Sequence, residues 1–334
     1  MARKPQAQSN EDRLIARHFK PIARHPGALG LIDDAATLKP PPGHDIVITA
    51  DAVVSGVHFF PDDPADAIAH KALRVNLSDL AAKGARPAGF LLTLAMPKRT
   101  NDGWLKAFSR ALGADAKRYG CPLLGGDTVR TPGPLTVSIT AFGVLPAGTM
   151  VRRNGARVGD HVLVSGTIGD AALGLQLRRG IQLARRWKLS AQERSHLACR
   201  YLVPEPRDAL AIAVRKHATG AMDVSDGLAG DLAKMCVASG VAAVIDVARV
   251  PLSSAARKAS MADRKWLVTA LSGGDDYEIV CTVRPNRLGA FQSAARALGV
   301  AVTDIGRIVR GAGVSFRLPN GQVLTLARGS FSHF

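Results

Sequence analysis

Aspartate residues recur along the 334-residue chain in short segments rich in Gly, Ser and Ala. The first segment, GLIDDAATLKP, places Asp33 and Asp34 side by side. Several of these aspartates directly follow an apolar strand, where a short carboxylate can project into a cleft, and neighbouring glycine lets a ligand approach closely. Mg²⁺ prefers oxygen ligands and usually combines a few carboxylates with water and substrate phosphates. The other segments contain Asp51 in TADAVVSGVHF, Asp79 in VNLSDLAAKGA, Asp127 in LLGGDTVR, Asp223 and Asp226 in MDVSDGL, and Asp275 and Asp276 in SGGDDYE.

Each segment taken alone also has an ordinary structural explanation. DVSDGL is equally consistent with an N-cap, in which Ser225 or Asp226 caps a helix that runs through Leu232. GGD at residues 125–127 is typical of a turn, and adjacent aspartates are commonly solvated. SGTIGDAALG at residues 165–174 lacks the G-x-G-x-x-G spacing and predicts a tight turn from strand to helix. The prediction of a metal site therefore depends on the segments taken together and in order.

The charge balance is strongly basic, with 44 Lys and Arg against 27 Asp and Glu, a formal net charge of +17. Such a charge favours an anionic substrate or a nucleic acid. Most of the excess is scattered, and its one dense segment, LRRGIQLARRWK at 177–188, predicts a solvated helix face. Because no recognised nucleic-acid-binding module accompanies the charge, we expect no specific nucleic-acid partner.

Nothing in the sequence predicts a membrane span or a secreted protein. The longest apolar run, at residues 88–96, is about half of the ~18 residues that a transmembrane helix requires. The first residues, MARKPQAQSNEDR, lack the apolar region of a secretory signal. The four cysteines are far apart without a C-x-x-C pair, which argues against zinc and disulfides and predicts small, mostly buried residues. We expect a cytoplasmic protein.

The element pattern predicts an α/β (α+β) fold in two successive domains. Strands alternate with helices in the first half, and the same alternation begins again after residue 146 with GDHVLVSGTIGDAALGLQL. This predicts an N-terminal domain over 1–146 and a C-terminal domain over 147–334. The expected elements of the first half are a capped helix at 9–19, strands at 45–54, 89–97 and 135–146, and helices at 66–85 and 102–120.

In this order, the segments DDAA, TADAVVSGVHF, ALRVNLSDLAAKGA, GGDT, RRNGARVGDHVLVSG, MDVSDGL and GGDDYE resemble the thiamine-monophosphate kinases. These enzymes belong to the superfamily of aminoimidazole ribonucleotide synthetase, and the resemblance covers residues 10–334. VNLSDLAA and DVSDGL occur across that superfamily, whereas GVHF and GGDDYE point to the thiamine-monophosphate enzymes. The resemblance implies a two-domain fold, a homodimer formed by the N-terminal domain, and γ-phosphate transfer from ATP to thiamine monophosphate. Several Mg²⁺ ions assist this transfer, and no protein nucleophile is required.

The resemblance also implies roles for individual residues. Asp34 becomes a further metal ligand or a neighbour of the ligands. Arg152 is an alternative to its neighbour Arg153 for contacting ATP. A carboxylate and an aromatic face would hold the cationic thiamine rings. The implied Mg²⁺ ligands are Asp33, Thr49, Asp51, Asp79, Asp127, Asp223 and Asp226; the ATP-binding residues are Gly126, Asp127, Arg153 and Ser225; and the thiamine monophosphate residues are His58, Asp275 and Phe331.

Two departures and several alternatives accompany this resemblance. Ile32 stands where the family usually has Gly, so the loop bends differently or that position needs no positive φ. The ending FSHF replaces an expected YDHF-like one, which affects the role of Phe331. Selenophosphate synthetase needs a reactive Cys near its amino terminus, whereas the first cysteine here is Cys121. The hydrogenase-maturation dehydratase ends in Cys, and this sequence ends in SHF; GVHF and GGDDYE argue against aminoimidazole ribonucleotide synthetase itself. A non-catalytic basic scaffold would not need so many carboxylates.

Overall fold

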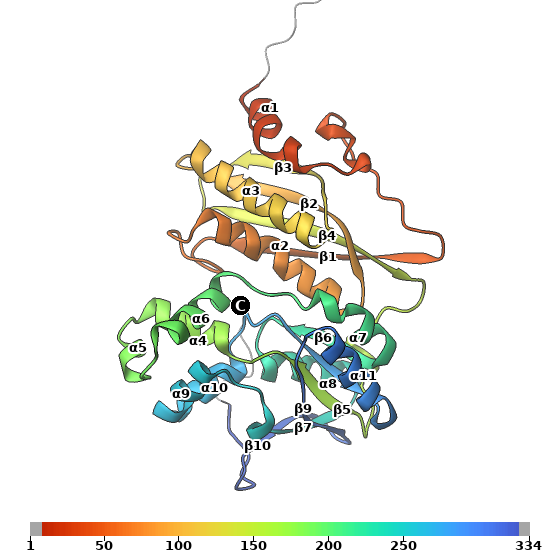
Figure 1. Ribbon diagram of the computed structural model, residues 1–334, viewed down its shortest axis with the longest axis vertical. Coiled ribbons are helices and arrows are strands. Elements are labelled where there is room, and N and C mark those ends of the chain that lie inside the picture. Colours follow the sequence, from red (N-terminus) through yellow and green to blue (C-terminus); the bar gives the residue numbers. More distant parts are fainter. Residues whose placement is uncertain (1–8, 327–334) are drawn as a thin grey trace, which may run out of the picture. The chain divides into compact units, whose positions relative to one another are not determined.

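The computed structural model describes residues 9–326, and their contacts divide them into two compact units (Figure 1). The first unit contains residues 9–42, 48–76 and 87–144. The second contains residues 145–326 together with two short segments from the first half of the chain, 43–47 and 77–86. The segments of the two units alternate along the sequence up to residue 144. The predicted domain boundary at residues 146/147 stays a prediction.

A four-stranded sheet with the order β1-β4-β2-β3 forms the framework of the first half of the chain. Its strands are β1 (His44–Val54), β2 (Arg86–Met96), β3 (Leu123–Arg130) and β4 (Thr136–Pro146). Helices α2 (Ala65–Ala82) and α3 (Asp102–Arg118) lie along one face of this sheet (Figure 1). Every second residue of β4 is buried, as expected for a strand with one covered face. These elements confirm the strands and helices predicted for residues 45–146.

Strand β3 corrects one alternative drawn from the sequence. Residues 125–127 form no turn but lie inside β3, which pairs in parallel with β2. Gly and Asp are depleted in strands because they pack poorly on a pleated surface, so composition favoured the turn. The backbone pairing with β2 outweighs that preference.

A run of short helices precedes β1. Helix α1 (Asn10–Leu14) begins at the predicted cap, where Ser9 and Asp12 form a reciprocal capping box. It continues as a π-helical turn at Ile15–Phe19 and short 3-10 turns at Lys20–Ile22 and Pro26–Leu31.

The second unit is built on a six-stranded sheet with the order β10-β7-β9-β5-β8-β6. Only β10 and β7 pair in parallel, and β5 lies antiparallel to both β8 and β9. The strands are β5 (His161–Ser165), β6 (Ala218–Val224), β7 (Ala242–Asp246), β8 (Glu278–Val283), β9 (Val302–Val309) and β10 (Gly313–Arg317). The helices are α4 (Asp170–Arg179), α5 (Leu183–Arg186), α6 (Ala191–Leu202), α7 (Ala211–His217), α8 (Leu228–Ser239), α9 (Ser254–Ala262), α10 (Arg264–Ser272) and α11 (Leu288–Ala297).

Apolar side chains from both faces of this sheet form the core of the second unit. Val162, Met222 and Ile245 pack with α8 on one side, and Leu163, Ala221 and Cys281 pack with α7 and α11 on the other. Three of the four cysteines are buried as predicted, whereas Cys199 is exposed. No helix in the described part of the chain is both long and apolar enough to cross a membrane.

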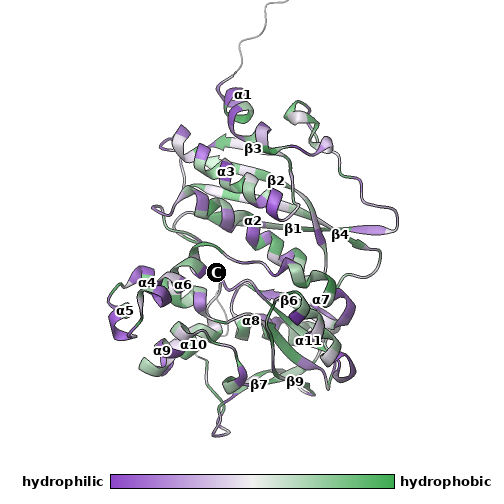
Figure 2. Ribbon diagram, viewed as in Figure 1, coloured by the Kyte–Doolittle hydropathy of each residue, from purple (hydrophilic) through white to green (hydrophobic). Residues whose placement is uncertain are grey.

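The basic segment 177–188 forms two helices rather than one face of a single helix. Helix α4 ends before Gly180, and α5 begins at Leu183. Its arginines are exposed, as predicted, and this region is among the most hydrophilic of the unit (Figure 2). The strand-to-helix turn predicted at residues 165–174 is confirmed, with Gly166 and Gly169 at positive φ between β5 and α4.

Candidate functional site

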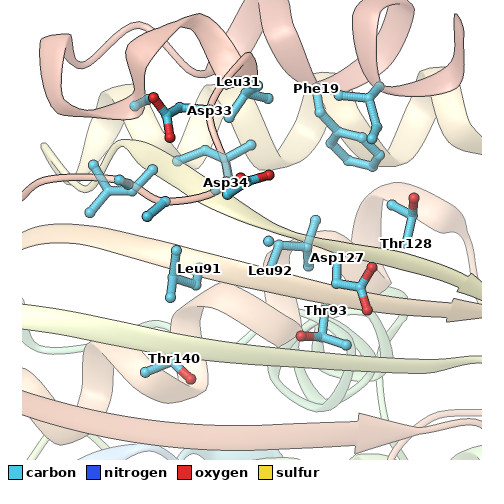
Figure 3. Close-up of a pocket in the computed structure, with 18 of the residues that line it drawn as sticks. Phe19, Leu31, Asp33, Asp34, Leu91, Leu92, Thr93, Asp127, Thr128 and Thr140 are labelled. Atoms are coloured by element: carbon cyan, nitrogen blue, oxygen red, sulfur yellow. The ribbon is translucent and has the colours of Figure 1, made fainter. Parts of the chain in front are cut away.

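A pocket of about 750 Å³ lies in the first unit between the N-terminal segment and the sheet (Figure 3). Four carboxylates line it, from Glu11, Asp33, Asp34 and Asp127, and none of its lining residues in the described part of the chain is basic. Its volume falls within the range of small-molecule sites. The structure therefore brings Asp33, Asp34, Gly126 and Asp127, four residues singled out from the sequence, to one pocket.

The pairing of β2 with β3 positions the sheet side of this pocket. Thr93 pairs with Asp127, so their side chains lie next to each other (Figure 3). Gly126 has a φ of 156°, and a Cβ there would lie 1.8 Å from the carbonyl oxygen of Leu92. Only glycine fits this close approach, so the backbone contact with β2 explains why glycine precedes Asp127.

The N-terminal segment supplies the opposite side of the pocket. Thr128 of β3 donates a hydrogen bond of 3.1 Å to the carboxylate of Glu11, which links α1 to the sheet. Ile32 is 83% exposed and has an ordinary φ of −114°, so the position needs no glycine. The left-handed residues are Leu29, Gly30 and Leu31, directly before it. The β-branched Ile32 is therefore compatible with the loop that carries Asp33 and Asp34.

Three further predicted residues of the first unit lie on or just after strand β1. Thr49 and Asp51 lie in the strand, and His58 lies in the turn that follows it. Thr49 and Asp51 are two residues apart, so their side chains share one face of the strand. The backbone N–H of Asp51 donates to the amide oxygen of the buried Asn76 in α2, at 3.1 Å. His58 Nδ1 accepts a hydrogen bond from the backbone N–H of Val54, at 3.0 Å. In the neutral ring the proton therefore lies on Nε2, which is a donor.

In the second unit, the loop after β6 packs against the GGDDYE segment. The carbonyl oxygens of Val224 and Ser225 accept hydrogen bonds from the backbone N–H groups of Tyr277 and Asp275, at 2.9 and 2.8 Å. Asp275 and Tyr277 both have positive φ, at 72° and 51°. The Tyr277 hydroxyl donates to the Asp275 carboxylate. The fold thus places two predicted residues, Ser225 and Asp275, on adjoining loops.

Two buried acidic residues of the GGDDYE segment, Asp276 and Glu278, anchor it through hydrogen bonds and ion pairs. Asp276 accepts hydrogen bonds from the backbone N–H groups of Gly169 and Ala171 at the start of α4. Complete burial, with Asp170 and Glu278 nearby, holds the pKa of Asp276 well above its usual range. Glu278 is also buried and is paired with Arg200 and Arg207. These contacts fix the strained backbone of residues 275–277.

The carboxylates of Asp79 and Asp223 lie around Lys83, a residue that the sequence interpretation missed. Lys83 follows Asp79 by one helical turn and donates a hydrogen bond of 2.8 Å to the carbonyl oxygen of Ala221. Burial lowers the pKa of Lys83, and Arg153 lowers it further, while Asp223 and Asp79 act in the opposite direction. The spacing of four residues in SDLAAK was the available signal. Arg153, Asp79 and Asp223 therefore all lie near Lys83.

Asp226 has a different environment from the other predicted metal ligands. Its carboxylate forms an ion pair with Lys234 of α8, which also pairs with the buried Asp231. Burial lowers the pKa of Lys234, but hydrogen bonds to Asp226 and Asp231 outweigh it and raise the pKa overall. The helix begins after Gly227 without a side-chain cap, so the interpretation of Ser225 or Asp226 as an N-cap is wrong.

The donor atoms at these positions are oxygens, which fits a hard cation such as Mg²⁺. Within residues 9–326, no group of three His, Cys, Asp or Glu side chains is arranged to hold a metal ion. Phe331 lies outside the described residues. Besides Lys83, the sequence interpretation missed Glu11 and Thr93, whose segments carried no motif, and Thr128, which lies in the GGDT segment but was assigned no role.

Family models and solved structures place the chain among known proteins. The AIR synthase related protein N-terminal domain matches residues 32–145, and the corresponding C-terminal domain matches residues 157–319. The thiamine-monophosphate kinase of Caulobacter vibrioides is 45% identical over 312 residues, which span 90% of this chain and 84% of that protein.

Solved structures agree with this placement. The crystal structure of thiamine-monophosphate kinase from Stenotrophomonas maltophilia K279a has a TM-score of 0.81 at 40% identity, covering 94% of this chain and 96% of that one. The structure of AaThiL complexed with AMPPCP and TMP has a TM-score of 0.75 at 28% identity, covering 92% and 97%. With its two-domain α/β AIR-synthase-like fold, the chain belongs to the AIR synthase related family and, within it, to the thiamine-monophosphate kinases.

Proposed function

We propose that the protein transfers the γ-phosphate of ATP directly to the phosphate of thiamine monophosphate, giving thiamine diphosphate and ADP. Family membership supports the reaction, and a relative of the same fold binds AMPPCP and TMP. The observation that carries the proposal is the convergence of Asp33, Gly126 and Asp127 on one pocket of about 750 Å³.

The chemistry explains why so many carboxylates are needed. Donor and acceptor are both phosphates, so the principal tasks are to neutralise their charge and to hold them in line. Bound Mg²⁺ supplies the positive charge that brings the two anions together. Because the acceptor is already an anion at neutral pH, the chain needs neither a nucleophile nor a general base. The proposed Mg²⁺ ligands are Asp33, Thr49, Asp51, Asp79, Asp127, Asp223 and Asp226, and Asp226 must first exchange its ion pair with Lys234.

Other side chains bind and orient the two substrates in this proposal. Gly126 and Ser225 lie along the nucleotide phosphates in this proposal, and Ser225 contributes polar contacts to them. Arg153 is the ATP-contacting arginine, and its position near Lys83, which also has Asp79 and Asp223 nearby, supports this choice over Arg152. The Nε2–H of His58 donates to the phosphate of thiamine monophosphate. Asp275 and Phe331 hold the cationic thiamine rings through charge pairing and a cation–π contact.

The protein acts as a homodimer formed by its N-terminal domain. The first sheet carries exposed apolar residues on both edge strands, with Ile48 of β1 62% exposed and Val129 of β3 42% exposed. Burying such residues against a second copy is favourable, because it removes apolar area from water. Sedimentation of wild-type protein and an Ile48→Asp/Val129→Asp variant tests this assembly. A variant that stays dimeric would contradict the proposed interface.

Product analysis tests the reaction itself. Purified protein is incubated with ATP, Mg²⁺ and thiamine monophosphate, and thiamine diphosphate and ADP are quantified separately. We expect equimolar products that require thiamine monophosphate and disappear when the metal is chelated. ADP without thiamine diphosphate would contradict the proposed acceptor, and phosphorylated amines and amidines would then be the next acceptors to test.

A further inference from the structure

A second pocket, of about 360 Å³, lies in the second unit at the start of β6 and the end of β8. Five of its lining residues are basic: Arg157, Lys216, His217, Arg284 and Arg287. The remaining lining residues are Gly155, Ala218 and Thr219, so none of the lining residues in the described part of the chain is acidic. All the charged or titratable residues that line this concave surface are thus basic.

The cationic side chains of this pocket are not held in ion pairs among the described residues. Among residues 9–326, no carboxylate forms an ion pair with the side chain of Arg157, Lys216, Arg284 or Arg287. The nearby carboxylate of Asp160 is buried and is already hydrogen-bonded by the backbone N–H of Arg157 and the hydroxyl of Thr219. Four cationic side chains without ion-pair partners among the described residues therefore surround a small volume.

His217 is the titratable residue of this pocket and lies among its basic side chains. Its Nδ1 is buried and has no hydrogen-bond partner among the described residues. A buried polar atom without a partner is costly, so the fold holds this ring beside the pocket at the expense of one unmade hydrogen bond. Burial, together with Arg287 and Lys216, lowers the pKa of His217. This direction agrees with a positive local field around the ring.

The pocket is separate from the loops of the proposed kinase site. Next to the pocket, one end of each of three neighbouring strands lies side by side: Val283 of β8 pairs with both His161 of β5 and Ala218 of β6. Ser165, Val224 and Glu278 lie at the opposite ends of these strands, where the loops with Ser225 and Asp275 begin. With a rise of about 3.3 Å per residue, the two ends are roughly 15–20 Å apart.

We propose that this pocket binds the diphosphate or triphosphate group of a small molecule. Arginine forks bind phosphate oxygens with two parallel hydrogen bonds, and three arginines with Lys216 match a compact anion that carries several charges. The pocket lies near the lower end of the size range of ligand sites, which suits an oligophosphate without a large attached group. Thr219 and the neighbouring residues 216–218 line it as well.

Binding of inorganic pyrophosphate to the full-length protein in chelator-containing buffer tests this site. Calorimetry gives the affinity, and the NMR signals of His217, assigned with a His217→Asn variant, report where the anion binds. We expect saturable binding that raises the pKa of His217, and weaker binding of orthophosphate. Arg284→Gln/Arg287→Gln should weaken binding by about tenfold or more, because two charged hydrogen-bond donors are lost.

A charge-matched control is provided by Arg264→Gln/Arg296→Gln, which removes two exposed arginines outside the pocket. This control should bind pyrophosphate like the wild type. Equal weakening in both double variants, or binding without a change at His217, would overturn the site and leave only nonspecific charge attraction. ADP that shifts His217 as pyrophosphate does would identify a nucleotide as the source of the phosphate group, whereas an ADP-insensitive His217 would identify the free anion. Tighter binding of duplex DNA, with displacement of pyrophosphate, would overturn the small-molecule proposal.

Discussion

The two pockets of this protein have opposite charge. The pocket in the first unit is lined by four carboxylates and no basic residue, and the pocket in the second unit by five basic residues and no carboxylate, both within the described residues. A phosphate can enter the first only together with cations, whereas the second attracts it directly. The net charge of +17 therefore predicts the character of neither pocket, because each depends on which side chains the fold brings together.

The largest expected effect concerns the acidic pocket. Asp33→Asn and Asp127→Asn each remove a charged oxygen ligand without changing side-chain shape, so thiamine diphosphate formation should fall by at least about a hundredfold. Steady-state turnover measures this, and thermal melting checks that the fold is intact. Asp246→Asn is the matched control, because Asp246 only caps the turn at Val247–Arg249, a role that Asn can fill. A fully active Asp33→Asn enzyme would refute the role of this carboxylate.

Both pockets contain a glycine in close contact with a neighbouring strand. A Cβ at Gly126 or at Gly155 would lie 1.8 Å from the carbonyl oxygen of Leu92 or Thr219, respectively. Each Gly→Ala change should therefore lower the free energy of unfolding by about 3 kcal/mol, measured with urea.

Gly289, in the first turn of α11 with no heavy atom within 4 Å of its virtual Cβ, is the control. Its change to Ala should be neutral or stabilising by up to about 0.5 kcal/mol. If Gly155→Ala were as harmless as Gly289→Ala, the backbone contact beneath the basic pocket would be refuted.

Two histidines of the second unit should give opposite pH dependence. The hydrogen bond that His196 donates to the carboxylate of Asp170 raises the pKa of His196, whereas burial lowers that of His217. The stabilisation from His196 is complete below its unfolded pKa of about 6.5 and disappears as the pH rises through the raised folded value. His217 instead disfavours the folded state as the pH falls below about 6.5.

Chemical denaturation of His196→Asn and His217→Asn from pH 5 to 9 measures these trends. The destabilisation by His196→Asn should grow toward acid by less than about 1 kcal/mol, because the side chain is 43% exposed. The His217→Asn difference should shift in the opposite sense. Parallel curves for the two variants would contradict the assigned environments.

The smallest effect probes the field inside the basic pocket. Arg287→Gln removes one of the charges that lower the pKa of His217, so this pKa should move upward. An NMR titration of the ring signals measures the change. Arg296→Gln, in the same helical region but outside the pocket, should leave the titration unchanged. If the pKa of His217 did not move in Arg287→Gln, the electrostatic effect of Arg287 on His217 would be refuted.

Much of the fold could be predicted from the sequence, because apolar periodicity and caps are local signals. The capping box at Ser9 and the turn at residues 165–174 illustrate this success. Of two exceptions, the first depends on a partner far away in the chain and the second on a local glycine. Strand β3 contains Gly and Asp and becomes a strand through pairing with β2, and the segment 177–188 breaks at Gly180.

The candidate site was only partly predictable for the first of these reasons. The segments with Asp33 and Asp127 carry motifs, and the fold brings them together 94 residues apart in the sequence. Glu11 lies in an ordinary first helical turn, and no local signal indicated that it would face Thr128. The ion pair between Asp226 and Lys234 and the five basic residues of the second pocket likewise come from separate segments.

The contrast between the pockets is tested most directly by binding AMPPCP with and without Mg²⁺. The protein is the Arg284→Gln/Arg287→Gln variant, in which the basic pocket is weakened, and calorimetry supplies the affinity. We expect saturable binding with Mg²⁺ and at least tenfold weaker binding with a chelator, since four carboxylates then face the phosphates alone. Equal affinity under both conditions would contradict the claim that the acidic pocket receives phosphate through divalent cations.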